Sequence, residues 1–480
     1  MKVANNAERI RRELLIRIIR NFMRGTLKDV IDRIAVDMRP RKERPSRCCV
    51  YKDRAVLKYR VMAMLGFGIE DEIDEAKALS KYLKEATERQ APDDNILSVL
   101  DVACSACVES QYLVTNACRG CFARPCTFNC PRDAIQVVDG QARIDHSLCI
   151  DCGKCTKVCP YHAIIRVPIP CEEACPVNAI KKRSDGTQVI NFKSCISCGK
   201  CMQACPFGAI LERSQIIDVL NAIKKGKKVV AMVAPSIVGQ FPGKLAQIAE
   251  AVKLVGFELM EEVAHGAQMT TEHETKEFFE HMEQGDHIMT SSCCPAYVET
   301  VKKHVPLLQP YVSDTPSPMR FTARVVKEKY GCDCVSVFIG PCVAKRKEAQ
   351  RSPKVDYVLT FEELGSFFAA MNIDVASLKG IKLPRKVEGY ARGFASSCGV
   401  TSAMLKESTK TVADSNLDND AKFINGLDQK TVKQLHLYGK GKLPGNFLEV
   451  MACEGGCVGG PCVLGDVKLA TRAVKASTEE

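Results

Sequence analysis

Two stretches of the sequence carry four cysteines at the spacing C-x2-C-x2-C-x3-C-P, which is typical of [4Fe–4S] clusters. Their cysteines are Cys149, Cys152, Cys155 and Cys159 in the first stretch, and Cys195, Cys198, Cys201 and Cys205 in the second. The tight turns between the first three cysteines let three thiolates converge on one cluster, while the fourth reaches a second cluster. A zinc ribbon needs only paired C-x2-C units, so the spacing favours iron–sulfur binding over zinc.

A variant of this motif precedes the two stretches. It has the spacing C-x2-C-x4-C-x3-C-P and consists of Cys118, Cys121, Cys126 and Cys130. Its distance from the next motif resembles that inside a bacterial two-cluster ferredoxin, so we expect the two halves to exchange their fourth ligands. One predicted cluster takes Cys118, Cys121, Cys126 and Cys159, and the other takes Cys149, Cys152, Cys155 and Cys130.

The second repeat is incomplete. By the same exchange of ligands, a third predicted cluster takes Cys195, Cys198, Cys201 and Cys175. Cys171 and Cys205 then lack a C-x2-C pair, and a spare pair occurs at Cys104 and Cys107. Ligand counting therefore predicts a fourth cluster from Cys104, Cys107, Cys171 and Cys205. The alternative is that Cys104 and Cys107 are free buried thiols and that only three accessory clusters form.

Three further cysteine segments lie in the C-terminal half, each where a strand is expected to end. They are TSSCCPAY, with Cys293 and Cys294, GPCVAKRKE, with Cys342, and FLEVMACEGGCVGG, with Cys453 and Cys457. Ligands gathered at the carboxyl ends of strands are expected of an open α/β sheet, and four of these cysteines can hold one cubane. For any one segment taken alone, a cysteine packed in the core is a plausible alternative.

Together the three segments resemble the signature segments of [FeFe] hydrogenases, and the resemblance covers residues 118–460. It implies that Cys294, Cys342, Cys453 and Cys457 bind the [4Fe–4S] half of the H-cluster. Cys457 would also bridge to a diiron unit that carries CO, cyanide and an azadithiolate. Cys293 would pass protons to the bridge amine instead of binding metal.

The resemblance also implies roles for residues around the diiron unit. The family's proton path matches, from the outside inward, Glu277, Ser313, Glu274 and Cys293. The residues matched to the cofactor surroundings are Lys345, Ser236, Glu348 and Met451, of which Lys345 and Ser236 would donate hydrogen bonds to cyanide. Without the resemblance, Glu274 and Glu277 would be interpreted as a solvated acidic helix face, and Lys345 as a surface lysine.

The sequence departs from the best-known members of the family at several positions. Gly340 replaces a Met and Tyr297 replaces a Trp, while Met319 stands where a Gln lies near the CO ligands. After Gly460 the expected Gly-Gln-Pro continuation is replaced by Pro461 and Cys462. These changes resemble a divergent subgroup called group B, and different contacts around the diiron site should alter its potential and its response to oxygen.

The elements that must position these residues fall into three predicted regions. Residues 1–100 are expected to form a helical N-terminal region, because Ile10, Leu14 and Ile18 recur at helical spacing. Residues 101–212 form tandem ferredoxin-like domains, in which two units repeat a Cys-Pro, a strand, an Asp-Gly hairpin turn, a strand and a cysteine run. Residues 213–480 alternate apolar strands with helices. The predicted fold class is α+β multidomain, ending in a two-lobed α/β H-cluster domain with mainly parallel sheets.

Composition restricts the function classes further. The 480 residues include 27 cysteines in patterned spacing, which favours metal ligation in a reducing compartment over disulfides. The net charge of +11 invites a nucleic-acid partner, but four or five clusters of roughly −2 each would cancel about 8 to 10 charges. No apolar run is long enough for a membrane span and no export signal is evident, so a cytoplasmic location is expected. The basic N-terminal region either packs on the protein or docks an acidic electron-transfer partner.

These observations predict an enzyme that interconverts protons, electrons and H2. Its redox partner is expected to be a ferredoxin or a similar protein, and maturation proteins would supply the diiron unit. Two alternatives stay open: an H2 sensor with slow turnover, and a hydrogenase-like assembly factor that lacks the diiron chemistry. The catalytic direction, the oligomeric state and the roles of six cysteines are not predicted; these are Cys48, Cys49, Cys332, Cys334, Cys398 and Cys462.

Overall fold

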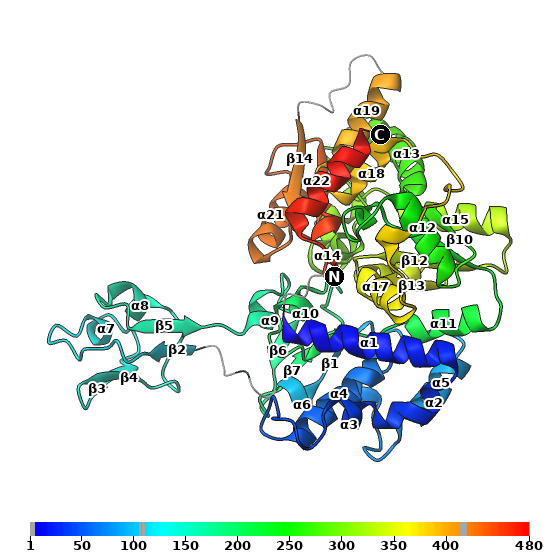
Figure 1. Ribbon diagram of the computed structural model, residues 1–480. Coiled ribbons are helices and arrows are strands. Elements are labelled where there is room, and N and C mark those ends of the chain that lie inside the picture. Colours follow the sequence, from blue (N-terminus) through cyan, green and yellow to red (C-terminus); the bar gives the residue numbers. More distant parts are fainter. Residues whose placement is uncertain (1–4, 105–106, 108–110, 412–419, 480) are drawn as a thin grey trace.

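The computed structural model describes residues 5–104, 107, 111–411 and 420–479. Figure 1 shows a main body and a smaller unit, built around β2, β3, β4 and β5, that projects away from it. The main body holds the N-terminal helices at one end and the C-terminal α/β layers at the other. The mixed α+β fold class predicted from the sequence is confirmed.

The N-terminal region is helical, as predicted, and its longest helix is α1 (Asn6–Arg24). Asn5 caps α1 by accepting a hydrogen bond from the Glu8 amide, and Gly25 ends it in the left-handed conformation that glycine tolerates. The apolar stripe of α1 is buried, including Leu14 and Ile18, and the helix packs along α17 (Phe361–Ala370). The other helices of this region are α2 (Leu27–Val30), α3 (Ile34–Met38), α4 (Val50–Met64) and α5 (Leu79–Glu88).

The cysteine-rich region contains the two predicted hairpins. β3 (Ile135–Val138) pairs with β4 (Gln141–Ile144), and Asp139 and Gly140 between them both have positive φ, as a type I′ turn requires. β6 (Ile180–Lys182) pairs with β7 (Gln188–Ile190). Two further antiparallel pairs join β2 (Gln111–Val114) to β5 (Ile164–Val167), and β1 (Leu97–Val99) to β8 (Ile210–Glu212). Its short helices are α6 (Asp101–Cys104), α7 (Pro125–Phe128), α8 (Lys154–Val158), α9 (Pro170–Glu173) and α10 (Lys200–Ala204).

The C-terminal region contains two parallel sheets, in line with the expected two-lobed architecture. The first has the strand order β10-β9-β12-β13, from β9 (Val229–Val233), β10 (Leu259–Glu262), β12 (Val335–Gly340) and β13 (Tyr357–Thr360). The second has the order β11-β15-β14, from β11 (Met289–Thr290), β14 (Ala421–Asn425) and β15 (Phe447–Met451). Every residue of β9, β12 and β15 is buried, which explains why these strands are mostly apolar.

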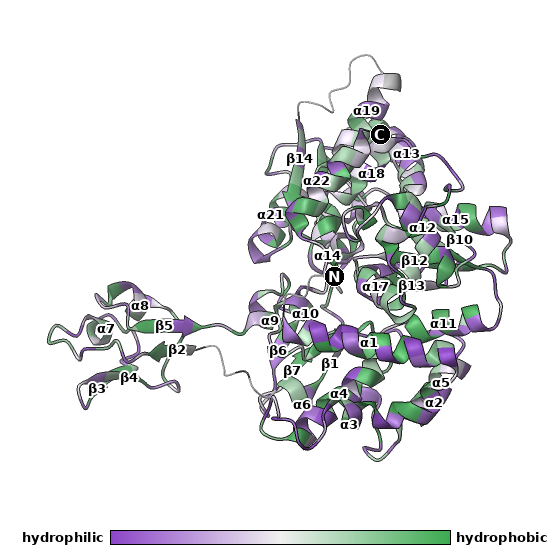
Figure 2. Ribbon diagram, viewed as in Figure 1, coloured by the Kyte–Doolittle hydropathy of each residue, from purple (hydrophilic) through white to green (hydrophobic). Residues whose placement is uncertain are grey.

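Besides α17, the helices of the C-terminal region lie around these sheets (Figure 1). They are α11 (Ile216–Lys224), α12 (Leu245–Leu254), α13 (Val263–Glu283), α14 (Pro295–His304), α15 (Pro318–Tyr330), α16 (Ala344–Ala349), α18 (Gly389–Arg392), α19 (Gly399–Thr411), α21 (Gln429–Gly439) and α22 (Val467–Thr478). Figure 2 shows hydrophobic and hydrophilic stretches alternating along α1 and α11, as expected of helices with one buried face. None of the helices in the described ranges combines the length and apolar character that a bilayer crossing needs.

Candidate active site and its iron–sulfur relay

The cysteine segments of the C-terminal half follow directly after three buried parallel strands. Cys294 comes after β11, Cys342 after β12 and Cys453 after β15. Since the three strands belong to two different sheets, the site forms where the carboxyl ends of both sheets meet. Cys457 lies four residues beyond Cys453, at the start of a short 3-10 helix.

All four cysteines line one internal cavity, so the structure brings the expected ligand set together. Burial, helped by the neighbouring thiolates, raises the pKa of Cys342 to about 12 and that of Cys457 to about 11. Thiols with such pKa values keep their protons at neutral pH until a metal replaces them. A cationic iron core would therefore compensate the four converging sulfurs.

Two hydrogen-bond donors expected near cyanide lie on the wall of the same cavity. The Ser236 hydroxyl is fully buried and has no hydrogen-bond partner among the described residues. Lys345 donates to Glu348 Oε2 at 2.6 Å and to Ser317 Oγ at 3.3 Å. Burial by itself lowers the pKa of Lys345, but the Glu348 carboxylate more than offsets this and keeps the ammonium charged. An orphaned hydroxyl and a buried cation fit an anionic ligand in this cavity.

The departures from the family have structural counterparts around the cavity. A Cβ at Gly340 would lie 2.6 Å from the Phe338 ring, so the ring takes the space beside the glycine. Phe338 and Met319 both line the cavity, as does Met451. Tyr297 is fully buried and its hydroxyl donates to Thr290 Oγ1 at 2.8 Å.

The residues of the expected proton path lie in succession, from the surface of α13 to the cavity. Ser313 donates to Glu277 Oε2 at 2.6 Å, and Ser313 also interacts with Glu274. Glu274 is fully buried, accepts from the Ser292 amide at 3.3 Å, and acts electrostatically on Cys293. Burial is the main reason that the pKa of Glu274 rises to about 8. This carboxyl group is therefore largely protonated at neutral pH and can both donate and accept a proton.

The structure adds residues to the site that the sequence did not single out. Thr315 Oγ1 donates to Glu277 Oε2 at 2.6 Å, so a second hydroxyl contacts the outer carboxylate. Glu449 on β15 is buried, interacts with both Cys293 and Cys457, and has its pKa raised by burial. In the sequence, the one sign that Glu449 belongs to the site is its charge within the otherwise apolar segment FLEVM. Ser317, in the segment YVSDTPSP, donates to Glu348 and contacts Lys345.

The cysteines assigned to a fourth accessory cluster lie together. Burial raises the pKa of Cys171 to about 12, and the thiolates of Cys205, Cys104 and Cys107 raise it further. Cys104 Sγ accepts a hydrogen bond from the Gln188 amide at 3.3 Å. The pair that ligand counting selected from a distant part of the sequence is therefore adjacent to the two otherwise unmatched cysteines.

The remaining cysteines also form the expected groups. Cys118, Cys121, Cys126 and Cys159 line one small cavity in the projecting unit. Cys155 interacts with Cys149 and Cys152, and Cys130 packs in the same cluster of side chains as Cys155. Cys201 interacts with Cys198, Cys195 and Cys175, and also with Cys171 of the neighbouring group. Cys198 in turn lines the active-site cavity and acts on Cys453. The groups of Cys171 and Cys198 thus lie next to each other and lead to the active-site cavity.

A recurring turn positions four of these sulfurs. In each Cys-Pro-x-x-Ala segment, the alanine amide donates to the Sγ atom four residues earlier. The four bonds join Ala134 to Cys130, Ala163 to Cys159, Ala179 to Cys175 and Ala209 to Cys205, at 3.2 to 3.4 Å. Hydrogen bonds to the sulfurs are among the factors that set a cluster's reduction potential.

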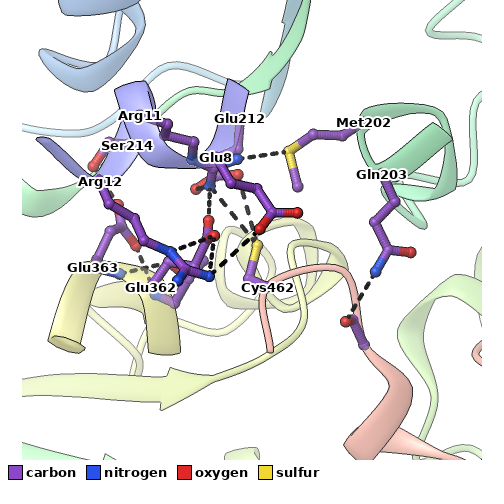
Figure 3. A network of polar contacts seen from close by, with 12 residues as sticks. Glu8, Arg11, Arg12, Met202, Gln203, Glu212, Ser214, Glu362, Glu363 and Cys462 are labelled. Atoms are coloured by element: carbon purple, nitrogen blue, oxygen red, sulfur yellow. Dashed lines mark hydrogen bonds and ion pairs between the residues drawn. The ribbon is translucent and has the colours of Figure 1, made fainter. Parts of the chain in front are cut away.

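A buried polar network joins α1 to the cluster-bearing segments (Figure 3). Arg11 pairs with Glu212 at 2.5 Å and with Glu362 at 2.9 Å. It also donates to Met202 Sδ at 3.3 Å and lies 4.0 Å from Cys462 Sγ. Cys462, which the sequence left without a role, is fully buried and donates to Glu212 at 3.7 Å.

Comparison with known families agrees with this geometry. The family "Iron only hydrogenase large subunit, C-terminal domain" matches residues 227–461. The cysteine-rich region matches the "LdpA Fe-S cluster-binding domain" over residues 165–216 and a "4Fe-4S binding domain" over residues 141–164. The first match includes both parallel sheets and all four cysteines of the active-site cavity.

Several hydrogenases are similar to this chain. Iron hydrogenase 1 of Clostridium pasteurianum is 26% identical over 391 residues, which is 69% of this chain and 66% of that protein. The NADP-reducing hydrogenase subunit HndD of Solidesulfovibrio fructosivorans is 28% identical over 386 residues, or 67% of this chain and 57% of that subunit. The chain therefore spans less than two thirds of the length of either relative.

A third relative matches about half of the chain. The periplasmic [Fe] hydrogenase large subunit of Nitratidesulfovibrio vulgaris is 28% identical over 302 residues, which is 52% of this chain and 72% of that subunit. The family matches, these relatives and the cysteine groups all support the resemblance inferred from the sequence. The chain is an [FeFe] hydrogenase-like protein with accessory [4Fe–4S] domains.

Proposed function

We propose that the chain is an [FeFe] hydrogenase that catalyses 2 H⁺ + 2 e⁻ = H2 at an H-cluster held by Cys294, Cys342, Cys453 and Cys457. The observation that carries the proposal is the position of Cys293. This thiol lines the cavity of the four cysteines and interacts with the buried carboxyl group of Glu274. A cluster that only transfers electrons would have no use for such an acid.

The H-cluster, when bound, supplies an iron centre at which protons and electrons combine or separate. The four cysteines hold its cubane, and Cys457 would also contact the diiron unit. Ser236 and Lys345 would hold the anionic cyanide ligands, because both present donors in a cavity with few other polar groups. Glu348 and Ser317 keep the Lys345 ammonium in position.

Protons would move along Glu277, Ser313, Glu274 and Cys293. The Glu277 carboxylate would take up a proton near the surface. The Ser313 hydroxyl, 2.6 Å from Glu277, would accept this proton and donate its own proton to Glu274. The pKa of Glu274, raised by burial to about 8, lets this group exist in both protonation states near neutral pH. Cys293 then delivers the proton at the cavity.

Electrons would reach the site through the accessory clusters. The group around Cys198 lies against Cys453, so its cluster would be the immediate donor to the cubane of the active site. The group of Cys104, Cys107, Cys171 and Cys205 lies behind it, since Cys171 interacts with Cys201. A ferredoxin-type protein would exchange electrons with this series, and maturation proteins would install the diiron unit.

The proposal is tested by loading the full chain with a complete diiron unit. Infrared bands of iron-bound CO and cyanide, together with H2 evolution from reduced methyl viologen, are expected. An assembly factor would give neither signal. Normal infrared bands with only very slow turnover would instead point to an H2 sensor.

A further inference from the structure

A basic loop lies between α3 and α4, next to the fourth group of accessory cysteines. Residues 39–47, RPRKERPSR, contain five Lys or Arg residues and one Glu. Arg41, Lys42 and Arg44 of this loop are exposed. We propose that this loop and the groove beneath it dock a small acidic one-electron carrier protein, which exchanges electrons with the cluster of Cys104, Cys107, Cys171 and Cys205.

The groove has a volume of about 470 Å3, and its charged lining is mainly positive. Arg39, Arg47, Lys52 and Arg60 line it, and Asp53 is its one acidic side chain. Asp53 is already engaged, because it accepts from the Ser46 amide at 2.7 Å and pairs with Arg47 at 3.9 Å. The surface thus offers an excess of positive charge that an acidic protein would complement.

The groove lies against the segment that follows Cys205. Pro206 and Phe207 form part of its lining. Arg60 donates to the Phe207 carbonyl at 3.1 Å and Arg47 to the same carbonyl at 3.4 Å. Arg60 also interacts electrostatically with Cys205. A carrier on this surface would therefore lie close to a ligand of the fourth cluster.

Arg60 adds a buried positive charge to this surface. It is 4% exposed, and its Nε has no hydrogen-bond partner among the described residues. Burial and the charges of Arg47, Arg11 and Arg39 lower its pKa to about 10. Negative charge on a docked carrier, together with the negative charge of the cluster, would offset the repulsion between Arg60 and these three arginines.

The transfer itself needs no bond to form or break. The reduced carrier loses one electron and the oxidised cluster gains it, so the carrier is oxidised by one unit and the cluster is reduced by one unit. The inference rests on the proposed function only in requiring a cluster at the fourth group. It does not require an active diiron unit, and the test therefore uses full chain with its [4Fe–4S] clusters but without that unit.

The test follows electron transfer from a reduced acidic flavodoxin by stopped flow. One-electron oxidation of the flavodoxin hydroquinone produces a blue semiquinone, whose absorbance does not depend on H2 chemistry. In the triple variant Arg41→Glu, Lys42→Glu, Arg44→Glu, we expect the second-order rate constant at low ionic strength to fall about 10-fold or more. The rate should also lose most of its salt dependence. The rate with the methyl viologen radical cation should not fall, because a cation gains nothing from the basic loop.

The matched control is Lys379→Glu, Lys382→Glu, Lys386→Glu, which reverses three exposed charges on another loop. It should leave the flavodoxin rate unchanged. An equal fall in both triple variants, or no fall in the first, would overturn the proposal. A fall only in Arg119→Glu, Arg124→Glu, Arg132→Glu would overturn it in favour of the projecting unit, where those three residues are exposed.

Discussion

Cys293 and Cys294 are neighbours in the sequence, but their surroundings give them different chemistry. Cys294 interacts with Cys342, Cys453 and Cys457, the other members of the proposed ligand set. Cys293 interacts with Glu274 and Glu449, two buried carboxyl groups, and burial raises the pKa of its thiol. One thiol therefore suits metal binding and the other suits proton transfer.

Replacing Cys293 tests this division. Cys293→Ala should leave the H-cluster assembled but lower H2 evolution by about 10²- to 10⁴-fold, which is the usual contribution of a positioned proton donor. Cys293→Asp should retain more activity than Cys293→Ala, because a carboxyl group can still relay a proton. The measurement is H2 evolution compared with the infrared bands of the same sample. Cys334→Ala, at a buried thiol outside the cavity, is the control and should keep full activity; full activity in Cys293→Ala would contradict the proton path.

Among the elements, the short loop from Cys453 to Cys457 runs close to a neighbouring segment. Gly456 has φ 89° and ψ −154°, a conformation that only glycine adopts readily. A Cβ at this position would lie 2.6 Å from the Ser396 backbone. The loop places two cysteines in one cavity while its backbone lies against the neighbouring segment, and at position 456 this close approach leaves room only for glycine.

Gly456→Ala should displace this loop and with it two cubane ligands. Backbone strain of about 1–3 kcal/mol would be added to the steric clash. We expect the chain to lose the active-site cubane, a fall of about four Fe per chain, while the accessory clusters remain. Iron analysis and electron paramagnetic resonance check this. Gly285→Ala is the control, since Gly285 also has positive φ but its Cβ would meet nothing within 4 Å, and its iron content should not change.

The helix α1 is held to the cluster-bearing segments by a buried ion pair network. Arg11 neutralises Glu212 at the end of β8 and Glu362 on α17. These two carboxylates belong to the cysteine-rich and the C-terminal regions, so one guanidinium joins three parts of the chain. Removing it would leave the buried Glu212 without its ion-pair partner, whereas Glu362 would keep its contact with Arg12 at 3.3 Å.

Arg11→Met should therefore lower stability by about 3–5 kcal/mol, the usual effect of breaking a buried pair from one side. The measurement is the thermal unfolding midpoint of the cluster-loaded chain. Arg17→Met on the same helix is the control, because Arg17 is 41% exposed and forms an i, i+4 pair with Glu13. Its loss should change stability by no more than about 0.5 kcal/mol. Equal midpoints for the two variants would show that the network does not anchor α1.

At the scale of the whole molecule, two of the cysteine groups lead to the active-site cavity. The group of Cys198 lies beside the cavity, and the group of Cys171 lies behind it. The two groups of the projecting unit lie farther out (Figure 1). The cysteine groups and the residues of the proposed proton path therefore approach the same cavity along different elements.

Iron content tests the number of clusters. Chain that lacks the diiron unit should contain about 20 Fe, because five cubanes hold four Fe each. The combined replacement of Cys104 and Cys107 by Ala should lower this to about 16, since the fourth accessory cluster would keep only two ligands. Replacing Cys48 and Cys49 by Ala is the control and should change nothing. A value of about 16 in both the parent and the Cys104, Cys107 variant would eliminate the fourth cluster.

The sequence by itself determined those features that depend on the spacing of nearby residues, namely the cluster motifs and the buried strands. Three thiolates within a few residues can only converge on one centre, so the repeated motifs specify clusters without knowledge of the fold. Buried parallel strands are mostly apolar, so β9, β12 and β15, and the cysteines after β12 and β15, were also recognisable. The α+β fold class and the family resemblance followed from these patterns and are confirmed.

Only the tertiary structure decided which distant residues meet. Ligand counting proposed that Cys104 and Cys107 join Cys171, but it left free buried thiols as an alternative, and only the structure places the pair beside Cys171. Glu449 looked like one residue of an apolar strand, and its place beside Cys293 depends on how β15 packs against β11. The position of the basic loop is also known only from the structure, where Arg47 and Arg60 donate to the Phe207 carbonyl. The charge of the loop alone does not indicate which cysteine group lies next to it. Spacing specifies short-range chemistry, whereas contacts between separate elements depend on packing that no single segment encodes.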